Sequence, residues 1–241
     1  MIDPARSFDR AAEAYEAARP SYPDALLDRL PLTVGATVLD VGAGTGKLTR
    51  VLARRYARVL AVEPLDGMRA ILEAVVPEAE SLAGSAEAIP LPDASVDGAF
   101  AAQAFHWFAN DDAMAEIARV IRPGGIFADV WNETLDPTPL PDAYRERLKE
   151  IFDAAPKTGM GPAERAEVVA RGPFGEAQQV TVQHEQRQDR AAVLGLISSV
   201  SAVARLHPDE AAALLADLGG LLPEGEYVFR IEATVRWAVR T

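Results

Sequence analysis

The chain has 241 residues, with 24 Lys or Arg and 36 Asp or Glu, which gives a formal net charge of −12. This length suffices for one large α/β domain with an elaboration. The lack of cysteine excludes a disulfide framework and a cysteine nucleophile, and with three scattered histidines we expect no metal site. The negative charge disfavours a nucleic-acid partner, because phosphate binding requires a basic surface.

Two features disfavour a membrane or exported protein. No apolar run approaches the roughly 20 residues of a membrane span, and Met1-Ile2-Asp3-Pro4 lacks the organisation of a signal peptide. We therefore expect a cytoplasmic protein with no membrane partner.

The first predicted element is an N-terminal amphipathic helix. Phe8, Ala11, Ala12 and Tyr15 recur at helical spacing, and Arg19-Pro20-Ser21-Tyr22-Pro23 follows as a turn. On pattern alone, this helix covers a sheet and buries Phe8 and Tyr15.

A glycine-rich loop follows the first predicted strand. The apolar run ends at Asp40, and three glycines then stand at every second position: Gly42, Gly44 and Gly46. Such spacing allows a tight turn and the close approach of a ligand to the backbone. An ordinary structural turn is the alternative.

Two better-known nucleotide loops do not match this segment. A P-loop needs glycine at position 41 and Ser or Thr at position 48, where Val41 and Leu48 stand. The dinucleotide fingerprint needs a small third residue where Lys47 stands. The remaining pattern is D-x-G-x-G-x-G.

Glu63 ends a second short apolar run, about twenty residues after the first glycine. In a strand–helix–strand unit, a carboxylate at this spacing can reach the ribose of a bound nucleotide. One ionised carboxylate can accept hydrogen bonds from both ribose hydroxyls. A solvated strand end is the alternative, but the register with the glycine loop favours binding.

Three further segments follow in order. Residues 84–92 read Gly-Ser-Ala-Glu-Ala-Ile-Pro-Leu-Pro, and residues 95–108 predict a fourth strand that runs into an aromatic loop. Residues 116–127 predict a helix, an Arg-Pro-Gly-Gly turn and a fifth strand, because proline and paired glycines stop a helix and allow positive φ. Alternation of strands and helices predicts a parallel, doubly wound sheet.

The pattern changes after Trp131. Residues 132–141 form a proline-punctuated linker, residues 142–154 predict a helix, and the Gly- and Pro-rich stretch 156–175 predicts loops. A strand is predicted at 180–186, and helices at 189–205 and 208–220. The strict alternation of residues 227–237 predicts a last, antiparallel strand with one polar face.

In this order and spacing, the motifs between residues 36 and 131 resemble class I S-adenosylmethionine (SAM) methyltransferases. The resemblance implies an α/β fold: a doubly wound, Rossmann-like, seven-stranded sheet with an antiparallel last strand and a helical cap inserted after strand five. We expect a single domain spanning 1–241, with an N-terminal lid at 1–34, a cofactor-binding core at 35–131, cap and sheet elaboration at 132–220, and the last strand at 221–241.

The resemblance also implies the cofactor, SAM, with S-adenosyl-L-homocysteine as product. The glycine-loop amides would meet the methionine end, Glu63 the ribose, and the Ala86 backbone the adenine. Family members often carry an acid where Ser85 stands, so either Ser85 or Glu87 meets the adenine amine. The predicted cofactor site comprises Tyr15, Arg19, Asp40, Gly42, Ala43, Gly44, Gly46, Glu63, Pro64, Met68, Ser85, Ala86, Glu87 and Gln103.

Within the family, the chain is most similar to the small-molecule branch of trans-aconitate and ubiquinone-synthesis type. Three segments carry this resemblance: the run Ala102-Gln103-Ala104-Phe105-His106-Trp107-Phe108, the turn from Arg119 to Gly125, and the N-terminal Tyr15 with Arg19-Pro20-Ser21-Tyr22. It implies that Tyr15 and Arg19 close over the cofactor and bind its carboxylate. It also implies transfer of a methyl group to a small molecule, at an oxygen of a carboxylate or hydroxyl, by direct in-line displacement.

His106 is the candidate general base, because it lies just past strand four, at the carboxyl edge where α/β ligands bind. Pocket lining and a surface position are its alternatives. The predicted acceptor pocket comprises His106, Trp107, Trp131, Ser198 and Ser199. We predict only structural positions for His184 and His207.

Two other classes remain open at this point. One is a non-catalytic SAM-binding or regulatory protein, and the other is a nicotinamide-dependent oxidoreductase, which Lys47 disfavours. We expect a monomer or a homodimer.

Overall fold

The computed structural model describes residues 16, 18–135, 139–156 and 159–241. The predicted positions Phe8 to Tyr15 therefore lie outside the described residues. The chain divides into two compact units. The helical unit comprises Met1–Pro20, Glu133–Lys157 and Gln183–Glu232, and the sheet unit comprises Ser21–Asn132, Thr158–Val182 and Ala233–Thr241.

Seven strands form one sheet in the order β3-β2-β1-β4-β5-β7-β6. They are β1 (Thr37–Val41), β2 (Arg58–Val62), β3 (Glu80–Leu82), β4 (Val96–Ala102), β5 (Ile121–Thr134), β6 (Gln178–Asp189) and β7 (Glu226–Val239). The pairs β1–β2, β1–β4, β2–β3 and β4–β5 are parallel. The predicted doubly wound, Rossmann-like sheet is confirmed.

The last strand runs antiparallel to β5, as predicted. The N–H of Leu135 donates to the carbonyl of Arg230 (2.9 Å), and the N–H of Arg240 donates to the carbonyl of Gly125 (2.7 Å). Partner numbers fall along β7 as they rise along β5, which is the antiparallel relation.

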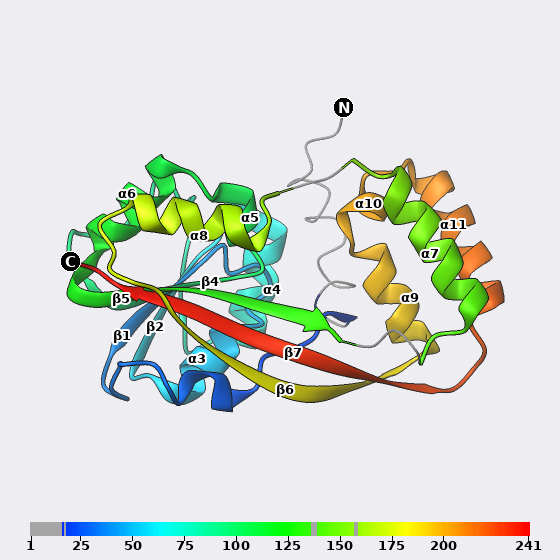
Figure 1. Ribbon diagram of the computed structural model, residues 1–241, viewed down its shortest axis with the longest axis horizontal. Helices are drawn as coiled ribbons and strands as arrows, with labels where there is room; N and C mark the ends of the chain where they lie inside the picture. Colours follow the sequence, from blue (N-terminus) through cyan, green and yellow to red (C-terminus); the bar gives the residue numbers. More distant parts are fainter. Residues whose placement is uncertain (1–15, 17, 136–138, 157–158) are drawn as a thin grey trace. The chain divides into compact units, whose positions relative to one another are not determined.

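Helices cover both faces of the sheet unit, and in Figure 1 α6 and α8 lie on one face and α3 on the other. The helices of this unit are η1 (Asp24–Leu27), α3 (Thr49–Arg55), α4 (Asp66–Val75), α5 (Phe105–Phe108), α6 (Asp111–Val120) and α8 (Pro162–Arg171). One core packs Leu39, Leu60 and Ala99 against α6, and the other packs Val38 and Val59 against α3. The central strands are apolar on both sides because both faces are covered.

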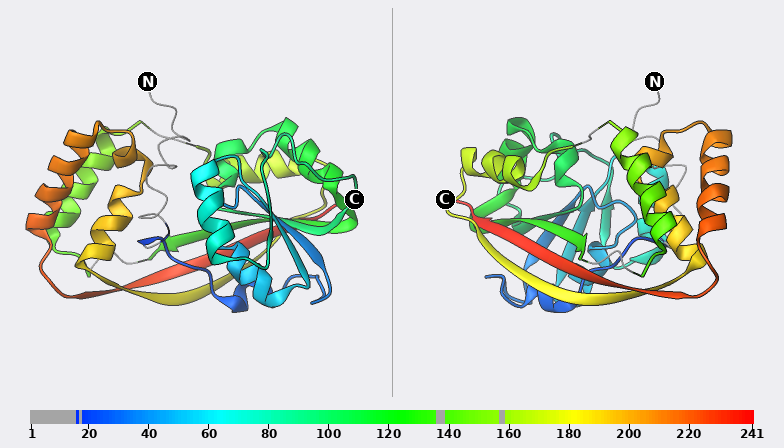
Figure 2. Two further views of the ribbon diagram at one scale, coloured as in Figure 1. Left: turned by 180° about the vertical axis from the view of Figure 1, so that it is seen from behind. Right: turned by 45° about the vertical axis from the view of Figure 1, so that its right-hand side comes forward.

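The helical unit contains α7 (Asp142–Ala154), α9 (Arg190–Ser198), α10 (Ser201–Ala204) and α11 (Pro208–Leu221). Figure 2 shows these helices as one cluster, and their apolar faces share a core with Tyr227, Phe229 and Ile231 of β7. Arg190 donates from Nε to the carbonyl of Leu222 (2.8 Å) and from Nη2 to that of Gly219 (2.7 Å), which satisfies carbonyls at the end of α11.

Three local predictions differ from the structure. The stretch 156–175 contains α8, so the prediction of loops throughout it was wrong. Gly161 is the N-cap and Pro162 the first helical residue, which are positions that favour these residue types. The aromatic loop after β4 contains the short helix α5, and the helix expected at 189–205 is divided into α9 and α10.

No helix among the described residues is long and apolar enough to span a bilayer.

Candidate functional site

Gly44 is the one of the three loop glycines that has open space where a side chain would stand. Its φ is +57°, in the left-handed region, and a Cβ built there would meet no heavy atom within 4 Å. At Gly42, by contrast, a Cβ would lie 3.0 Å from Ala104 Cβ, and at Gly46 it would lie 3.1 Å from Val76 Cγ2. Gly42 and Gly46 therefore permit close packing, whereas Gly44 leaves open space over the backbone.

Most of the loop amides are already engaged. Gly42 donates its N–H to the carbonyl of Val62 (2.9 Å), and Gly46 donates to that of Ala43 (3.0 Å). The predicted role of the three glycine amides toward the methionine end of the cofactor stays a prediction. The amides of Gly42 and Gly46 hold the shape of the loop.

The third glycine amide connects the loop to Glu63. Gly44 donates its N–H to Glu63 Oε2 (2.8 Å), and the N–H of Leu65 donates to Oε1 (2.9 Å). The side chain is buried at the end of β2. Each oxygen of an ionised carboxylate can accept more than one hydrogen bond, and these two N–H groups hold the Glu63 oxygens beside the loop. The residue thus fits the predicted role.

Asp40 lies beneath the loop, in β1. Its Oδ2 accepts from the Thr49 hydroxyl (2.7 Å) at the start of α3. Its Oδ1 is buried and has no hydrogen-bond partner in the described part of the chain. Burial raises the pKa of Asp40 to about 7, and the nearby Glu63 charge adds to this, although the Thr49 hydrogen bond opposes it. Asp40 therefore joins β1 to the start of α3, the two elements that flank the loop in the sequence.

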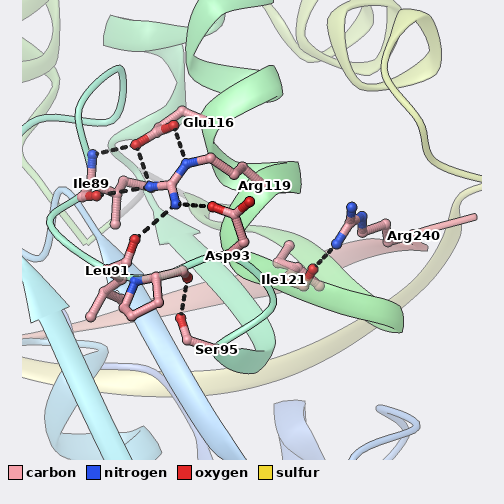
Figure 3. Close-up of polar contacts among 9 residues, drawn as sticks. Ile89, Leu91, Asp93, Ser95, Glu116, Arg119, Ile121 and Arg240 are labelled. Carbon is pink, nitrogen blue, oxygen red and sulfur yellow. Dashed lines mark hydrogen bonds and ion pairs between the residues drawn. The ribbon is translucent and has the colours of Figure 1, made fainter.

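The segment predicted to border the adenine is fastened to α6 by Arg119 (Figure 3). Its guanidinium donates to the carbonyls of Leu91 (2.8 Å) and Ile89 (3.0 Å) and pairs with Glu116 and Asp93, both at 2.7 Å. The N–H of Ile89 donates back to Glu116 Oε1 (2.9 Å). The Arg119 hydrogen bond holds the pKa of Glu116 below its usual range. The sequence did not predict this role of Arg119, since the carbonyls of Leu91 and Ile89 that it holds lie 28 and 30 residues away.

Within that segment the structure does not choose between the two candidates for the adenine amine. Ala86 is buried, Ser85 bridges to Ala88, and exposed Glu87 accepts from Asn110 Nδ2 (3.1 Å). The assignments of Ser85 and Glu87 stay predictions, as do those of Pro64, which is exposed, and of Met68, which is buried on α4.

Gln103 marks the end of β4 with an unusual backbone. Its φ is +47°, a conformation that non-glycine residues rarely adopt. Its N–H donates to the carbonyl of Val130 (2.9 Å), and its Nε2 donates to that of Asn132 (2.7 Å). Such strain persists where surrounding contacts hold it, and it concentrates at functional sites.

The structure brings three predicted pocket residues together. The His106 ring centroid is 4.7 Å from that of Trp107 and 5.4 Å from that of Trp131, in an edge-on arrangement with the latter. The N–H of Met160 donates to the carbonyl of His106 (3.3 Å). His106 is half-buried and Trp107 is 42% exposed, so this aromatic cluster has an accessible side.

Arg165 of α8 lies against this aromatic cluster and was not foreseen from the sequence. Its Cζ lies 4.4 Å from the Trp131 ring centroid, a cation–π contact. Its Nε donates to Asp129 Oδ2 (2.9 Å), and its Nη1 donates to the carbonyl of Met160 (3.1 Å). Arg165 is buried in a stretch that was predicted to form loops, and no sequence pattern around it indicates that burial.

The other predicted residues belong to the helical unit. Arg19 donates from Nε to Ser199 Oγ (3.0 Å) and from Nη2 to the Ser199 carbonyl (3.2 Å), and Ser198 donates to the carbonyl of Gly195 (2.7 Å). Tyr15 lies outside the described residues. The roles of Tyr15, Arg19, Ser198 and Ser199 stay predictions. His207 caps α11, accepting from the N–H of Asp209 (3.4 Å), a structural position as predicted.

Comparison with known proteins identifies the family. A model described as a methyltransferase domain matches residues 39–128. An uncharacterised methyltransferase of Mycobacterium tuberculosis is 40% identical over 200 residues, which cover 83% of this chain and 78% of the relative. A malonyl-[acyl-carrier protein] O-methyltransferase of Serratia marcescens is 36% identical over 126 residues, about half of each chain at 51% and 49%. A solved structure from Anaeromyxobacter dehalogenans, described as a proposed type II methyltransferase, is similar with a TM-score of 0.67 and 31% identity, over 92% of this chain and 97% of that one.

The chain belongs to the class I SAM-dependent methyltransferases. The predicted fold and the predicted class of enzyme are confirmed. Membership of this family favours SAM over a nicotinamide cofactor, and the accessible backbone at Gly44 beside the Glu63 carboxylate fits SAM.

Proposed function

We propose that this methyltransferase acts on a small molecule and methylates an oxygen, with a carboxylate favoured over a hydroxyl. Bound SAM supplies an electrophilic methyl group on a sulfonium. The observation that supports the assigned cofactor site best is the hydrogen bond from Gly44 N–H to Glu63 Oε2 (2.8 Å), because it places an accessible loop backbone next to a buried carboxylate.

The binding roles follow from this pairing. Glu63 accepts from the ribose hydroxyls through a carboxylate that the N–H groups of Gly44 and Leu65 orient. Gly44 admits the ligand against the loop, and Asp40 accepts from Thr49 and so joins the strand and the helix that flank the loop in the sequence. Met68, Pro64 and the segment from Ser85 to Glu87 border the adenine. Arg119 holds that segment rigid before the ligand arrives, which lowers the ordering cost of binding.

Oxygen as the acceptor atom rests on two resemblances. The branch most similar in sequence is of the trans-aconitate type, and the Serratia marcescens relative is an O-methyltransferase by name. A carboxylate is already ionised at neutral pH and needs no base, whereas a hydroxyl must lose a proton. His106, with Trp107 and Trp131 around it, would bind the first acceptor or deprotonate the second.

Kinetics of a His106→Ala variant separate these chemistries. The assay follows transfer from labelled SAM to a panel of small carboxylates, phenols and alcohols. With a carboxylate acceptor we expect mainly a higher KM. With a hydroxyl acceptor we expect kcat to fall by roughly 10²–10⁴-fold, the usual contribution of a positioned base.

His207→Asn is the matched control, because it removes an imidazole and keeps a side chain that can cap α11. Unchanged KM and kcat in His106→Ala would exclude His106 from both roles. SAM binding without transfer to any compound in the panel would favour a non-catalytic SAM-binding protein instead.

A further inference from the structure

A cavity of about 240 Å³ lies within the sheet unit, between α8 and the face that β5 and β7 present to it. Phe127 and Asp129 line it from β5, Arg236 from β7, and Ala166 and Val169 from α8. Figure 1 shows α8 lying over β5 and β7 at this place. None of the predicted cofactor residues lines this cavity.

One end of the cavity carries a buried carboxylate with unused acceptor capacity. Asp129 is 8% exposed, and its Oδ2 accepts from Arg165 Nε (2.9 Å). Its Oδ1 is buried and has no hydrogen-bond partner within the described ranges. A buried polar atom without a partner is costly, and in folded proteins such atoms are nearly always satisfied. An occupant with a donor group would satisfy Oδ1.

The surrounding charges select a neutral occupant. Arg165 and Arg236 both line the cavity, and Arg236 donates to Gln179 Oε1 (3.0 Å) and to the carbonyl of Pro162 (3.2 Å). Two guanidinium groups disfavour a cation, while the unsatisfied oxygen of Asp129 repels an anion. Glu176 also lines the cavity and adds a second negative charge that repels an anion, whereas Phe127 and Val169 contribute apolar surface.

The cavity is also connected to the predicted acceptor pocket. Arg165, which holds Asp129, stacks on Trp131 at 4.4 Å, and Trp131 in turn contacts His106 at 5.4 Å between ring centroids. An occupant that donates to Asp129 changes the field around Arg165, and Trp131 lies directly against that guanidinium.

We propose that this cavity is a second small-molecule site, which binds a neutral compound through an N–H or O–H donor to Asp129 Oδ1. The apolar part of the compound packs against Phe127 and Val169. The volume lies below the range of roughly 300–1,000 Å³ found for sites of drug-sized ligands, so the occupant is a fragment-sized molecule.

The test uses four phenyl compounds of similar size on the full chain saturated with S-adenosyl-L-homocysteine. Benzamide presents a neutral donor, benzylammonium a cation, benzoate an anion, and toluene no donor. Titrations are followed by NMR at the indole N–H of Trp131, assigned with Trp131→Phe. We expect benzamide to saturate and to shift this signal, with affinity at least about tenfold above the other three, since each of them lacks a neutral donor for Asp129.

A matched pair of variants locates the binding. Ala166→Leu fills the cavity from α8, whereas Ala163→Leu adds the same volume on an exposed position of that helix. We expect Ala166→Leu to weaken benzamide binding at least fivefold and Ala163→Leu to leave it unchanged. The proposal is overturned if benzamide does not saturate, if the four compounds bind alike, if the two variants behave alike, or if benzamide displaces the bound S-adenosyl-L-homocysteine.

Discussion

Asp40 and Glu63 are two buried carboxylates with very different environments. Glu63 accepts two backbone N–H groups, at 2.8 and 2.9 Å, which favour its ionised form. Asp40 accepts one hydroxyl, and its second oxygen has no partner among the described residues. Burial together with the Glu63 charge raises the pKa of Asp40 to about 7. The two carboxylates therefore differ in their hydrogen-bond donors, and the pKa of Asp40 lies near neutrality.

Asp40 should make the stability of the protein depend on pH. Its pKa in the folded state, about 7, is above the ordinary value of 3.8, so between these values the folded state holds a proton that the unfolded state has lost. Stability from this group is complete below pH 4 and is lost as the pH rises through 7. We expect urea unfolding to show a loss of about 1–3 kcal/mol between pH 5 and pH 8 that Asp40→Asn lacks. Equal pH dependence in both proteins would contradict the assignment.

Gly44→Val should abolish SAM binding without unfolding the protein. The site has open space for the added atoms, so the cost to folding is backbone strain of about 1–3 kcal/mol. Those atoms would occupy the space through which the ligand reaches the loop. Gly124→Val is a matched control, since Gly124 also has a positive φ of +81° and open space, but lies in the turn before the main part of β5. Calorimetric titration should show SAM binding only in the control, and binding by both variants would refute this role of Gly44.

At the scale of elements, α8 is held by two ion pairs of opposite character. Near its N-terminus Arg165 pairs with Asp129 at 2.9 Å, with side chains 4% and 9% exposed. At its C-terminus Arg171 pairs with Asp111 at 2.8 Å, with side chains 55% and 73% exposed. Only the first pair is shielded from water, so the first determines how firmly the helix is attached.

Removing the acidic residue of each pair should therefore lower the stability of the protein by different amounts. We expect Asp129→Ala to lower the free energy of unfolding by about 3–5 kcal/mol, because the variant leaves Arg165 buried and uncompensated. Asp111→Ala should cost about 0–1 kcal/mol, as exposed pairs do. Urea unfolding of the two variants measures the difference, and similar losses would show that the Arg165 pair is not buried in solution.

The elements that sequence predicted best carry strong local signals. β1, β2 and β4 are apolar runs, the Arg-Pro-Gly-Gly turn contains a positive φ at Gly124, and the alternation of residues 227–237 marks β7. α8 was missed because Gly161, Pro162 and Gly172 mark loops as often as helix ends. The segment between them is a helix partly because Val168 and Arg165 are buried against other elements. No local sequence pattern reveals this burial.

The residues of the candidate site also differ in whether the sequence could predict their roles. The glycine loop and Glu63 were predictable, because a spacing in the chain becomes a fixed distance in a strand–loop–helix unit. Arg119, Arg165 and the left-handed Gln103 were not, since their roles depend on partners 26 to 36 residues away. The hydrogen bonds of the Gly42 and Gly46 amides could not be predicted either, because a sequence does not show which N–H groups donate to carbonyls within or next to the same loop.

In the whole molecule, the predicted cofactor and acceptor residues are divided unequally between the two units. Most of the predicted cofactor residues, together with His106 and Trp131, belong to the sheet unit, while Arg19, Ser198 and Ser199 belong to the helical unit. The strands β5, β6 and β7 each continue from one unit into the other. The single domain expected from the sequence stays a prediction, and these continuous strands are consistent with it.

The central claim is that the sheet unit binds SAM through the Gly44 loop and Glu63. Calorimetric titration of the full chain with SAM, NADH and NADPH tests it, alongside Glu63→Ala and the control Glu80→Ala, whose exposed side chain pairs with Arg58 on neighbouring strands. We predict one SAM site, no binding of either nicotinamide cofactor, an affinity loss of about 1.5–3 kcal/mol in Glu63→Ala, and no change in Glu80→Ala. Undiminished SAM affinity in Glu63→Ala, or binding of NADH in place of SAM, would contradict the account.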